Sequence, residues 1–205
     1  MAVEMEYAFR SAAPAYDHRY LSNPIIEICR KLGVKKMLDL GCGNGAMTKA
    51  FFDAGFHIIG CDKSESGIAF ARQAYPEIAF HCIGTEDEPD ELGTGFDAVV
   101  SAEVIEHLFT PRSLPRFAAK LLRPGGNLVL TTPYHGYLKN LVLAVSGKID
   151  RHFTALWDHG HIKFWSRRTL SQLLMEEGFE ITGFIGVGRF PYLWKSMIVT
   201  ARAKS

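Results

Sequence analysis

Two carboxylates and an imidazole stand close together in the sequence, at Glu103, Glu106 and His107. If this stretch starts a helix, the spacings i, i+3 and i+4 put all three side chains on one face. One use of such a group is general acid and base catalysis, in which His107 takes the proton of a hydroxyl. The other is a divalent metal ion, for which Asp158-His159-Gly160-His161 offers a fourth ligand. The alternative is that the carboxylates only hydrogen-bond a nearby loop and the histidines are ordinary loop or core residues.

A glycine-rich turn at Gly41, Gly43 and Gly45 directly follows the apolar run 37–40. The run predicts a buried parallel strand, and the glycines come where that strand must turn into a helix. Glycines make sense where the backbone passes within contact distance of a ligand, because side chains would be in the way. The amides at the start of the helix could hold a carboxylate or a ribose hydroxyl.

Two acidic positions follow the next two predicted strands. Asp62 comes 21 positions after Gly41 and ends the second strand, where a carboxylate can accept both hydroxyls of a ribose. The loop Gly84-Thr85-Glu86-Asp87 follows the third strand and could accept a hydrogen bond from the amine of an adenine. A solvated acidic turn is the alternative for this loop.

The elements that must position these residues form one α/β domain covering residues 1–205. With 205 residues, 47% of them hydrophobic and 22% charged, the chain is large enough for one well-buried core. We expect an N-terminal helical cap over residues 1–33, in which Asn23-Pro24 opens a helix that ends at Gly33. The pattern predicts strands at 36–40, 56–61, 78–83, 95–101, 127–132, 179–185 and 196–203, and helices at 46–53, 64–75, 113–122 and 168–177. Pro124-Gly125-Gly126 reads as a tight turn.

Charge and hydropathy limit the partners of the chain. The net charge is +1 and no basic stripe is interleaved with aromatics, which disfavours a nucleic-acid partner. No run reaches the roughly 20 apolar residues of a membrane span, and residues 1–10 lack a secretory pattern, so we expect a cytoplasmic protein. The four scattered cysteines indicate reduced structural thiols.

Residues 134–165 form an insertion that is too long for a plain connection. Apolar residues recur there at helical spacing, at Tyr134, Tyr137 or Leu138, Leu141, Val142 and Val145, so a short amphipathic helix is expected. Further aromatics could wall an apolar substrate pocket, namely Phe153, Trp157, Phe164 and Trp165. The alternative is a helix that packs on its own domain.

An ordered set of motifs resembles the class I S-adenosylmethionine-dependent methyltransferases from about residue 20 to the C-terminus. The set is Leu38-Asp39-Leu40-Gly41-Cys42-Gly43-Asn44-Gly45, Asp62, Phe96-Asp97-Ala98-Val99-Val100, Glu103-Val104-Ile105-Glu106-His107-Leu108 and Leu122-Arg123-Pro124-Gly125-Gly126. A nicotinamide dehydrogenase would need G-x-G-x-x-G, which the glycine turn does not give. The part after the fifth strand is similar to the ubiquinone-biosynthesis O-methyltransferases, and also to small-RNA 3′-terminal 2′-O-methyltransferases.

The resemblance implies a Rossmann-like α/β fold, in which a seven-stranded, mostly parallel sheet has an antiparallel last strand and helices cover both faces. It also implies a binding site for S-adenosylmethionine. Asp39 and the loop of Gly41, Cys42, Gly43 and Gly45 would face the methionine part, Asp62 the ribose, and Glu86 or Asp87 the adenine, with Lys63 and Thr85 beside them. Ser101 and Glu103 would border the point where the methyl group leaves.

The resemblance further implies methyl transfer to a hydroxyl, with a thiol or amine less favoured, of a small apolar or aromatic acceptor. Glu103, His107 and His161 would be catalytic. In the small-RNA enzymes a similar segment and a later histidine hold Mg²⁺, so Glu103, Glu106, His107 and His161 would hold Mg²⁺ or another divalent cation, with His161 preferred over His159.

The ubiquinone-type enzymes suggest peripheral membrane contact through residues 134–147. A monomer or homodimer is expected. The alternatives are 2′-O-methylation of an RNA 3′ end and a non-catalytic cofactor-binding module.

Overall fold

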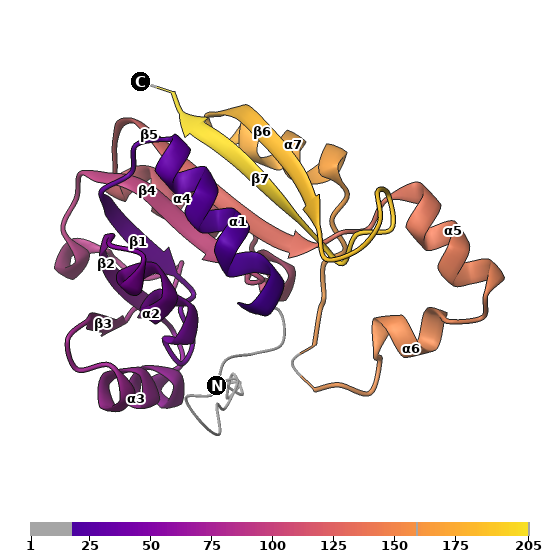
Figure 1. Cartoon of the computed structure of the whole chain (residues 1–205), viewed down its shortest axis with the longest axis horizontal. Helices are drawn as coiled ribbons and strands as arrows, with labels where there is room; N and C mark the ends of the chain where they lie inside the picture. The colour runs from indigo at the N-terminus through magenta and orange to yellow at the C-terminus, as the bar shows by residue number, and fades with distance from the viewer. Residues whose placement is uncertain (1–17, 159, 205) are drawn as a thin grey trace.

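The computed structural model describes residues 18–158 and 160–204, which form a central seven-stranded sheet with the order β3-β2-β1-β4-β5-β7-β6 (Figure 1). The strands are β1 (Lys36–Leu40), β2 (His57–Asp62), β3 (Ala79–Cys82), β4 (Phe96–Ala102), β5 (Leu122–Pro133), β6 (Phe179–Val187) and β7 (Ser196–Ala203). β7 runs antiparallel to both β5 and β6, and the other neighbours are parallel. The expected sheet with an antiparallel last strand is confirmed.

Helices cover both faces of this sheet. The covering helices are α1 (His18–Lys31), α2 (Ala46–Asp53), α3 (Glu65–Ala74), α4 (Ser113–Leu121) and α7 (Arg167–Glu176). Helices α5 (Tyr137–Val145) and α6 (Ile149–Phe153) lie beyond the sheet, and η1 (Asp90–Leu92) and η2 (Ile105–His107) are short 3-10 helices. In the part of the chain that the structure describes, no helix has the length and apolarity needed to cross a membrane.

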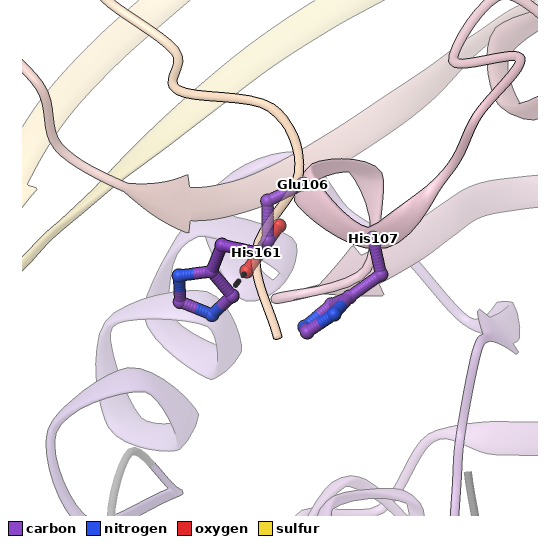
Figure 2. A group of neighbouring side chains, drawn as sticks. All are labelled: Glu106, His107 and His161. Atoms are coloured by element: carbon purple, nitrogen blue, oxygen red, sulfur yellow. Dashed lines mark ion pairs between the residues drawn. The ribbon is translucent and has the colours of Figure 1, made fainter. Parts of the chain in front are cut away.

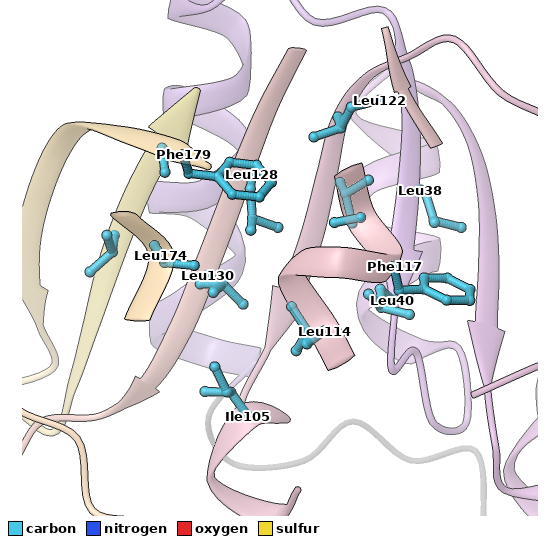
Figure 3. Close-up of a cluster of buried hydrophobic side chains, with 14 of the residues drawn as sticks. Leu38, Leu40, Ile105, Leu114, Phe117, Leu122, Leu128, Leu130, Leu174 and Phe179 are labelled. Carbon is cyan, nitrogen blue, oxygen red and sulfur yellow. The ribbon is translucent and has the colours of Figure 1, made fainter. Parts of the chain in front are cut away.

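Alternation along the strands divides the core into two layers. Met37 and Val100 face the layer under α1 and α2, whereas Leu38 and Val99 face the layer under α4 and α7, which Figure 3 shows. Because successive side chains of a strand point to opposite faces, strands that read as continuous apolar runs can supply both layers. The rigid sheet holds the carboxyl ends of β1, β2 and β4 side by side, and the site is built there.

Helix α1 begins earlier than the sequence pattern predicted. Pro24 lies inside the helix instead of opening it. Leu21, Ile25 and Cys29 are fully buried and recur at i, i+4 and i+8, so they form one stripe that packs on the sheet. Burial of this stripe outweighs the hydrogen bond that proline removes from the helix. Residues 1–17, the rest of the expected cap, lie outside the described residues.

The expected tight turn at Pro124-Gly125-Gly126 is also wrong, because β5 already begins at Leu122 and continues through it. Gly125 has φ 69°, and the register between β4 and β5 shifts between Phe96 and Ala98. The glycines therefore accommodate an irregularity within a paired strand.

The segment 134–165 leaves the sheet and returns to the same place. The expected amphipathic helix exists as α5, and α5 and α6 extend beyond the carboxyl end of β5 (Figure 1). In α5 the polar Lys139 is buried and apolar residues are exposed, which is the opposite of a helix that packs its apolar face on its own domain. Lys139 is 5% exposed, whereas Tyr137 is 83% exposed and Val145 82%. The His135 amide donates to the Trp165 carbonyl oxygen over 3.0 Å, which closes the excursion.

Candidate active site

The glycine turn after β1 depends on backbone conformations that other residues rarely adopt. Gly41, Gly43 and Gly45 have φ angles of 82°, 53° and 77°. A Cβ atom on Gly41 would lie 2.3 Å from Val104 Cγ2, and one on Gly45 would lie 2.8 Å from Phe80 Cζ. The turn therefore needs glycine for its own packing, a reason that the sequence alone did not reveal.

Asp62 fixes the shape of this turn from the end of β2. Its Oδ2 accepts a hydrogen bond from the Gly43 amide (2.7 Å), and its Oδ1 accepts one from the Ser64 amide (2.8 Å). Ser64 in turn caps α3 by accepting from the Gly67 amide. Asp62 therefore joins the glycine turn to α3, and a carboxylate oxygen can accept more than one hydrogen bond, as the expected contact with ribose hydroxyls requires.

Asp39 lies under the turn and is 2% exposed. Thr48 Oγ1 donates to its Oδ2 over 2.6 Å. Burial raises the pKa of Asp39 to about 7, the Thr48 hydrogen bond opposes the shift, and the charge of Asp62 adds to it. A cationic ligand group beside Asp39 would restore its charge, as the α-ammonium of an amino acid would do.

Two predicted cofactor residues already use their side chains inside the protein. Ser101 is buried and its Oγ donates to the Leu40 carbonyl oxygen over 2.7 Å. Cys42 packs among apolar residues between β2 and α3, and burial raises the pKa of its thiol. Both positions can therefore contact a ligand mainly through the backbone.

The acidic loop after β3 is an ordered turn. Asp87 Oδ2 accepts from the Gly84 amide over 2.7 Å, and the hydroxyls of Thr85 and Ser113 lie 2.8 Å apart. A cavity of about 260 Å³ is lined on one side by residues 85–88 and on the other by α4. Lys63 lies beside this loop, so close that a Cβ atom added to Gly84 would be 3.1 Å from Lys63 Cβ.

Glu103 does not share a helical face with Glu106 and His107, so that expectation is wrong. It has φ 55°, and the short helix η2 begins only at Ile105. Its Oε1 accepts from Thr131 Oγ1 (2.8 Å) and its Oε2 from Ser196 Oγ (3.1 Å). The Glu103 carboxylate therefore faces β5 and β7.

Glu106, His107 and His161 do come together, as Figure 2 shows. One potential ligand atom of each lies within 4.8 Å of the others. His161 Nε2 is 4.0 Å from Glu106 Oε1, and the rings of His107 and His161 are 4.9 Å apart. Burial, followed by the charges of His107 and His152, lowers the pKa of His161 to about 4, so its imidazole is neutral at physiological pH.

Backbone contacts bring the distant His161 to this cluster. The Glu106 carbonyl oxygen accepts from the amides of Ile162 (2.9 Å) and Lys163 (3.0 Å), which holds the returning chain beside η2. Thr132 Oγ1 donates to Glu106 Oε2 over 3.0 Å. Sequence reasoning missed Thr132, Thr131 and Ser196; the available signal was that Thr131 and Thr132 lie near the end of β5 and that Ser196 begins β7, which runs antiparallel beside it. His159 lies outside the described residues.

A sheet with this strand order, a glycine turn after β1 and a carboxylate at the end of β2 defines a class I S-adenosylmethionine-dependent methyltransferase. The chain belongs to the methyltransferase domain family, whose model matches residues 15–183.

Relatives and solved structures agree with this assignment. The chain is 26% identical over 164 residues to a ubiquinone biosynthesis O-methyltransferase of Aromatoleum aromaticum, covering 78% of this chain and 70% of the relative. The magnesium protoporphyrin IX methyltransferase of Synechocystis PCC 6803 with bound S-adenosylhomocysteine has a TM-score of 0.65 and 18% identity, over 92% of this chain and 83% of that one. The [4+2]-cyclase SpnF has a TM-score of 0.72 and 19% identity, over 99% and 88%. These two structures show the shared fold.

Proposed function

We propose that this methyltransferase transfers its methyl group to an oxygen of a small, fairly apolar or aromatic acceptor. The observation that carries the proposal is the Glu106, His107 and His161 cluster at the carboxyl edge of the sheet. The cofactor supplies the reactive methyl group, and the protein must orient the acceptor oxygen and take up its proton. A neutral imidazole at His161 can accept that proton as the oxygen–methyl bond forms.

Aromatic side chains beside the cluster support an apolar acceptor. The Trp157 ring lies 5.4 Å from the ring of His161 and 6.1 Å from that of His107. Phe153 and Phe164 meet edge to face at 4.8 Å. The relatives' name, ubiquinone biosynthesis O-methyltransferase, agrees with transfer to oxygen on such a molecule.

As the alternative to proton transfer to a free His161, the same cluster fits a divalent cation. One carboxylate and two imidazoles suit a borderline ion such as Zn²⁺ or Fe²⁺, and the carboxylate also suits Mg²⁺. A cation held by Glu106, His107 and His161 would lower the pKa of a bound hydroxyl. Glu103 is not part of this donor set, since it is held by Thr131 and Ser196.

Calorimetry with S-adenosylmethionine tests the cofactor site. We expect binding by the wild type and at least about tenfold weaker binding by Asp62→Ala, because two hydrogen bonds that shape the turn are lost. Asp53→Ala, which removes an exposed carboxylate that forms an ion pair with Lys49, is the control and should bind normally. An absence of binding by the wild type would contradict the proposal.

The metal is tested separately, by titrating Mn²⁺ or Zn²⁺ into the protein after dialysis against a chelator. We expect one binding event that Glu106→Gln abolishes and that Glu86→Gln leaves unchanged. Methyl transfer that survives both strong chelation and Glu106→Ala would end the metal proposal.

The exposed face of α5 supports a further proposal, that this helix rests on an anionic bilayer. Tyr137, Leu141 and Val145 are 83%, 44% and 82% exposed. Lys148 and Arg151 are exposed just after the helix and could meet lipid phosphates. Sedimentation with phosphatidylglycerol vesicles should carry the protein down, and Val145→Asp should weaken binding at least about fivefold. Equal sedimentation of the two proteins, or none with either, would contradict it.

A further inference from the structure

Lys139, in the first turn of α5, is a buried cation that the proposed chemistry leaves unused. It is 5% exposed, and its Nζ donates to the Lys195 carbonyl oxygen over 3.3 Å. A neutral carbonyl compensates a buried ammonium only weakly. Burial and then the charge of Arg189 lower the pKa of Lys139 to about 8, and Glu103 opposes them, so most of the charge remains at neutral pH.

The start of α5 adds to this positive field. Helix N-termini carry partial positive charge and usually attract acids. Here the N-cap residue Gly136 offers no side-chain acceptor and the first turn holds no acid. A lysine in the first turn is the opposite of the usual preference for acidic residues there, and the desolvation of its buried charge adds a further cost in free energy.

His135 provides an open hydrogen-bonding position next to this turn. The residue is 7% exposed, and among the described residues nothing hydrogen-bonds its Nδ1 atom. Burial, followed by the charges of Lys139 and His152, lowers the pKa of His135 to about 4, although a hydrogen bond with the Asn140 side chain opposes the shift, so the ring is neutral. Phe153 stacks on it at 5.7 Å, and Phe164 meets its edge at 5.1 Å.

Hydrogen bonds connect Lys139 to the reacting edge of the sheet. Lys139 is bonded to the carbonyl of Lys195, and the next residue, Ser196, donates to Glu103 Oε2 over 3.1 Å. Glu103 directly follows β4. The buried ammonium and the Glu103 carboxylate are thus anchored to adjacent residues at the start of β7, on the acceptor side.

We propose that Lys139 and His135 bind a carboxylate carried by an aromatic acceptor. The Lys139 ammonium and the Nδ1–H of a neutral His135 can each donate a hydrogen bond to the carboxylate, and the rings of Phe153 and Phe164 match the aromatic body. The buried cation is stabilised when the carboxylate arrives, so selectivity for acidic acceptors is built into the turn. This inference rests on the proposed methyl transfer to oxygen.

Two probe acceptors that differ only in charge test it, 3,4-dihydroxybenzoate and 3,4-dihydroxybenzamide. We expect the wild type to prefer the carboxylate about tenfold or more in kcat/KM, because charge-assisted hydrogen bonds are lost with the amide. Lys139→Met should lose this preference and change kcat/KM for the amide less than about threefold. Lys31→Met removes an exposed lysine at the end of α1 and should keep the preference.

Binding of both probes in the presence of S-adenosylhomocysteine, measured by calorimetry, gives a second readout that needs no turnover. A wild type that binds S-adenosylhomocysteine but shows no preference for the carboxylate in either readout overturns the inference and leaves the cofactor site standing. Retention of the preference by Lys139→Met overturns it too. Should Lys139→Met fail to fold, Lys139→Arg keeps the charge and must keep the preference.

Discussion

The predicted cofactor end and the proposed acceptor end of the same sheet edge are built in opposite ways. At the cofactor end, polar side chains are fixed by internal partners, as Thr48 fixes Asp39 and as the Gly43 and Ser64 amides fix Asp62. At the acceptor end, α5 buries a lysine and exposes its apolar residues. A site for one constant ligand can be preorganised through local contacts. At the proposed acceptor end, by contrast, the exposed apolar residues of α5 form a surface suited to contact with another partner, such as the proposed bilayer.

Substitution in the glycine turn should have the largest effect. Gly41→Ala combines a φ of 82° with a Cβ atom 2.3 Å from Val104 Cγ2, so we expect a loss of about 2–5 kcal/mol in the free energy of unfolding. Binding of S-adenosylmethionine should fall below detection. Urea unfolding and calorimetry measure the two effects.

Gly55→Ala is the matched control, because Gly55 has φ 94° but nothing within 4 Å of the added Cβ. It should cost about 1–2 kcal/mol through backbone strain alone and leave cofactor binding unchanged. Equal losses in the two variants would mean that the contact with Val104 has no energetic role.

Identical truncations in the two regions sharpen the contrast. Val100→Ala removes two methyl groups from a fully buried side chain in β4 and should cost about 2 kcal/mol in the free energy of unfolding. Val145→Ala in α5, where the side chain is 82% exposed, should stay within about 0.5 kcal/mol. A large loss at Val145 in urea unfolding would show that α5 is covered in solution.

Asp39→Asn should have a smaller effect that depends on pH. Because folding raises the pKa of Asp39 to about 7, the wild type loses stability as the pH rises from about 4 to about 7, and asparagine does not titrate. The variant should match the wild type near pH 4 and exceed it by about 1–3 kcal/mol at pH 8. It should also bind S-adenosylmethionine more weakly. A stability difference that is constant from pH 4 to pH 8 would contradict the assigned pKa.

Sequence reasoning worked best where the cause is local. The strand 36–40, the helix 46–53 and the turn between them were predicted with the observed bounds, since glycine spacing and an apolar run act over a few residues. The proximity of Glu106, His107 and His161 also agreed with the predicted cluster.

The expectations that the structure contradicts were wrong for one reason, because contacts between residues far apart in the sequence decided the conformation. Pro24 stays inside α1 because Leu21, one turn earlier, is buried against the sheet. Glu103 turns away from His107 because Thr131 and Ser196, from strands far along the chain, take its carboxylate. Burial of Lys139 follows from contact with Lys195, 56 positions further along the chain, which helical periodicity cannot encode.

The hydrogen bond between the His135 amide and the Trp165 carbonyl closes the acceptor-side excursion at its base. Residues 136–164 can therefore change in length and sequence without moving the strands at whose ends the predicted cofactor site lies. Since loop length costs little free energy once the ends are held, variation of this segment could change the proposed acceptor while the sheet keeps its fold.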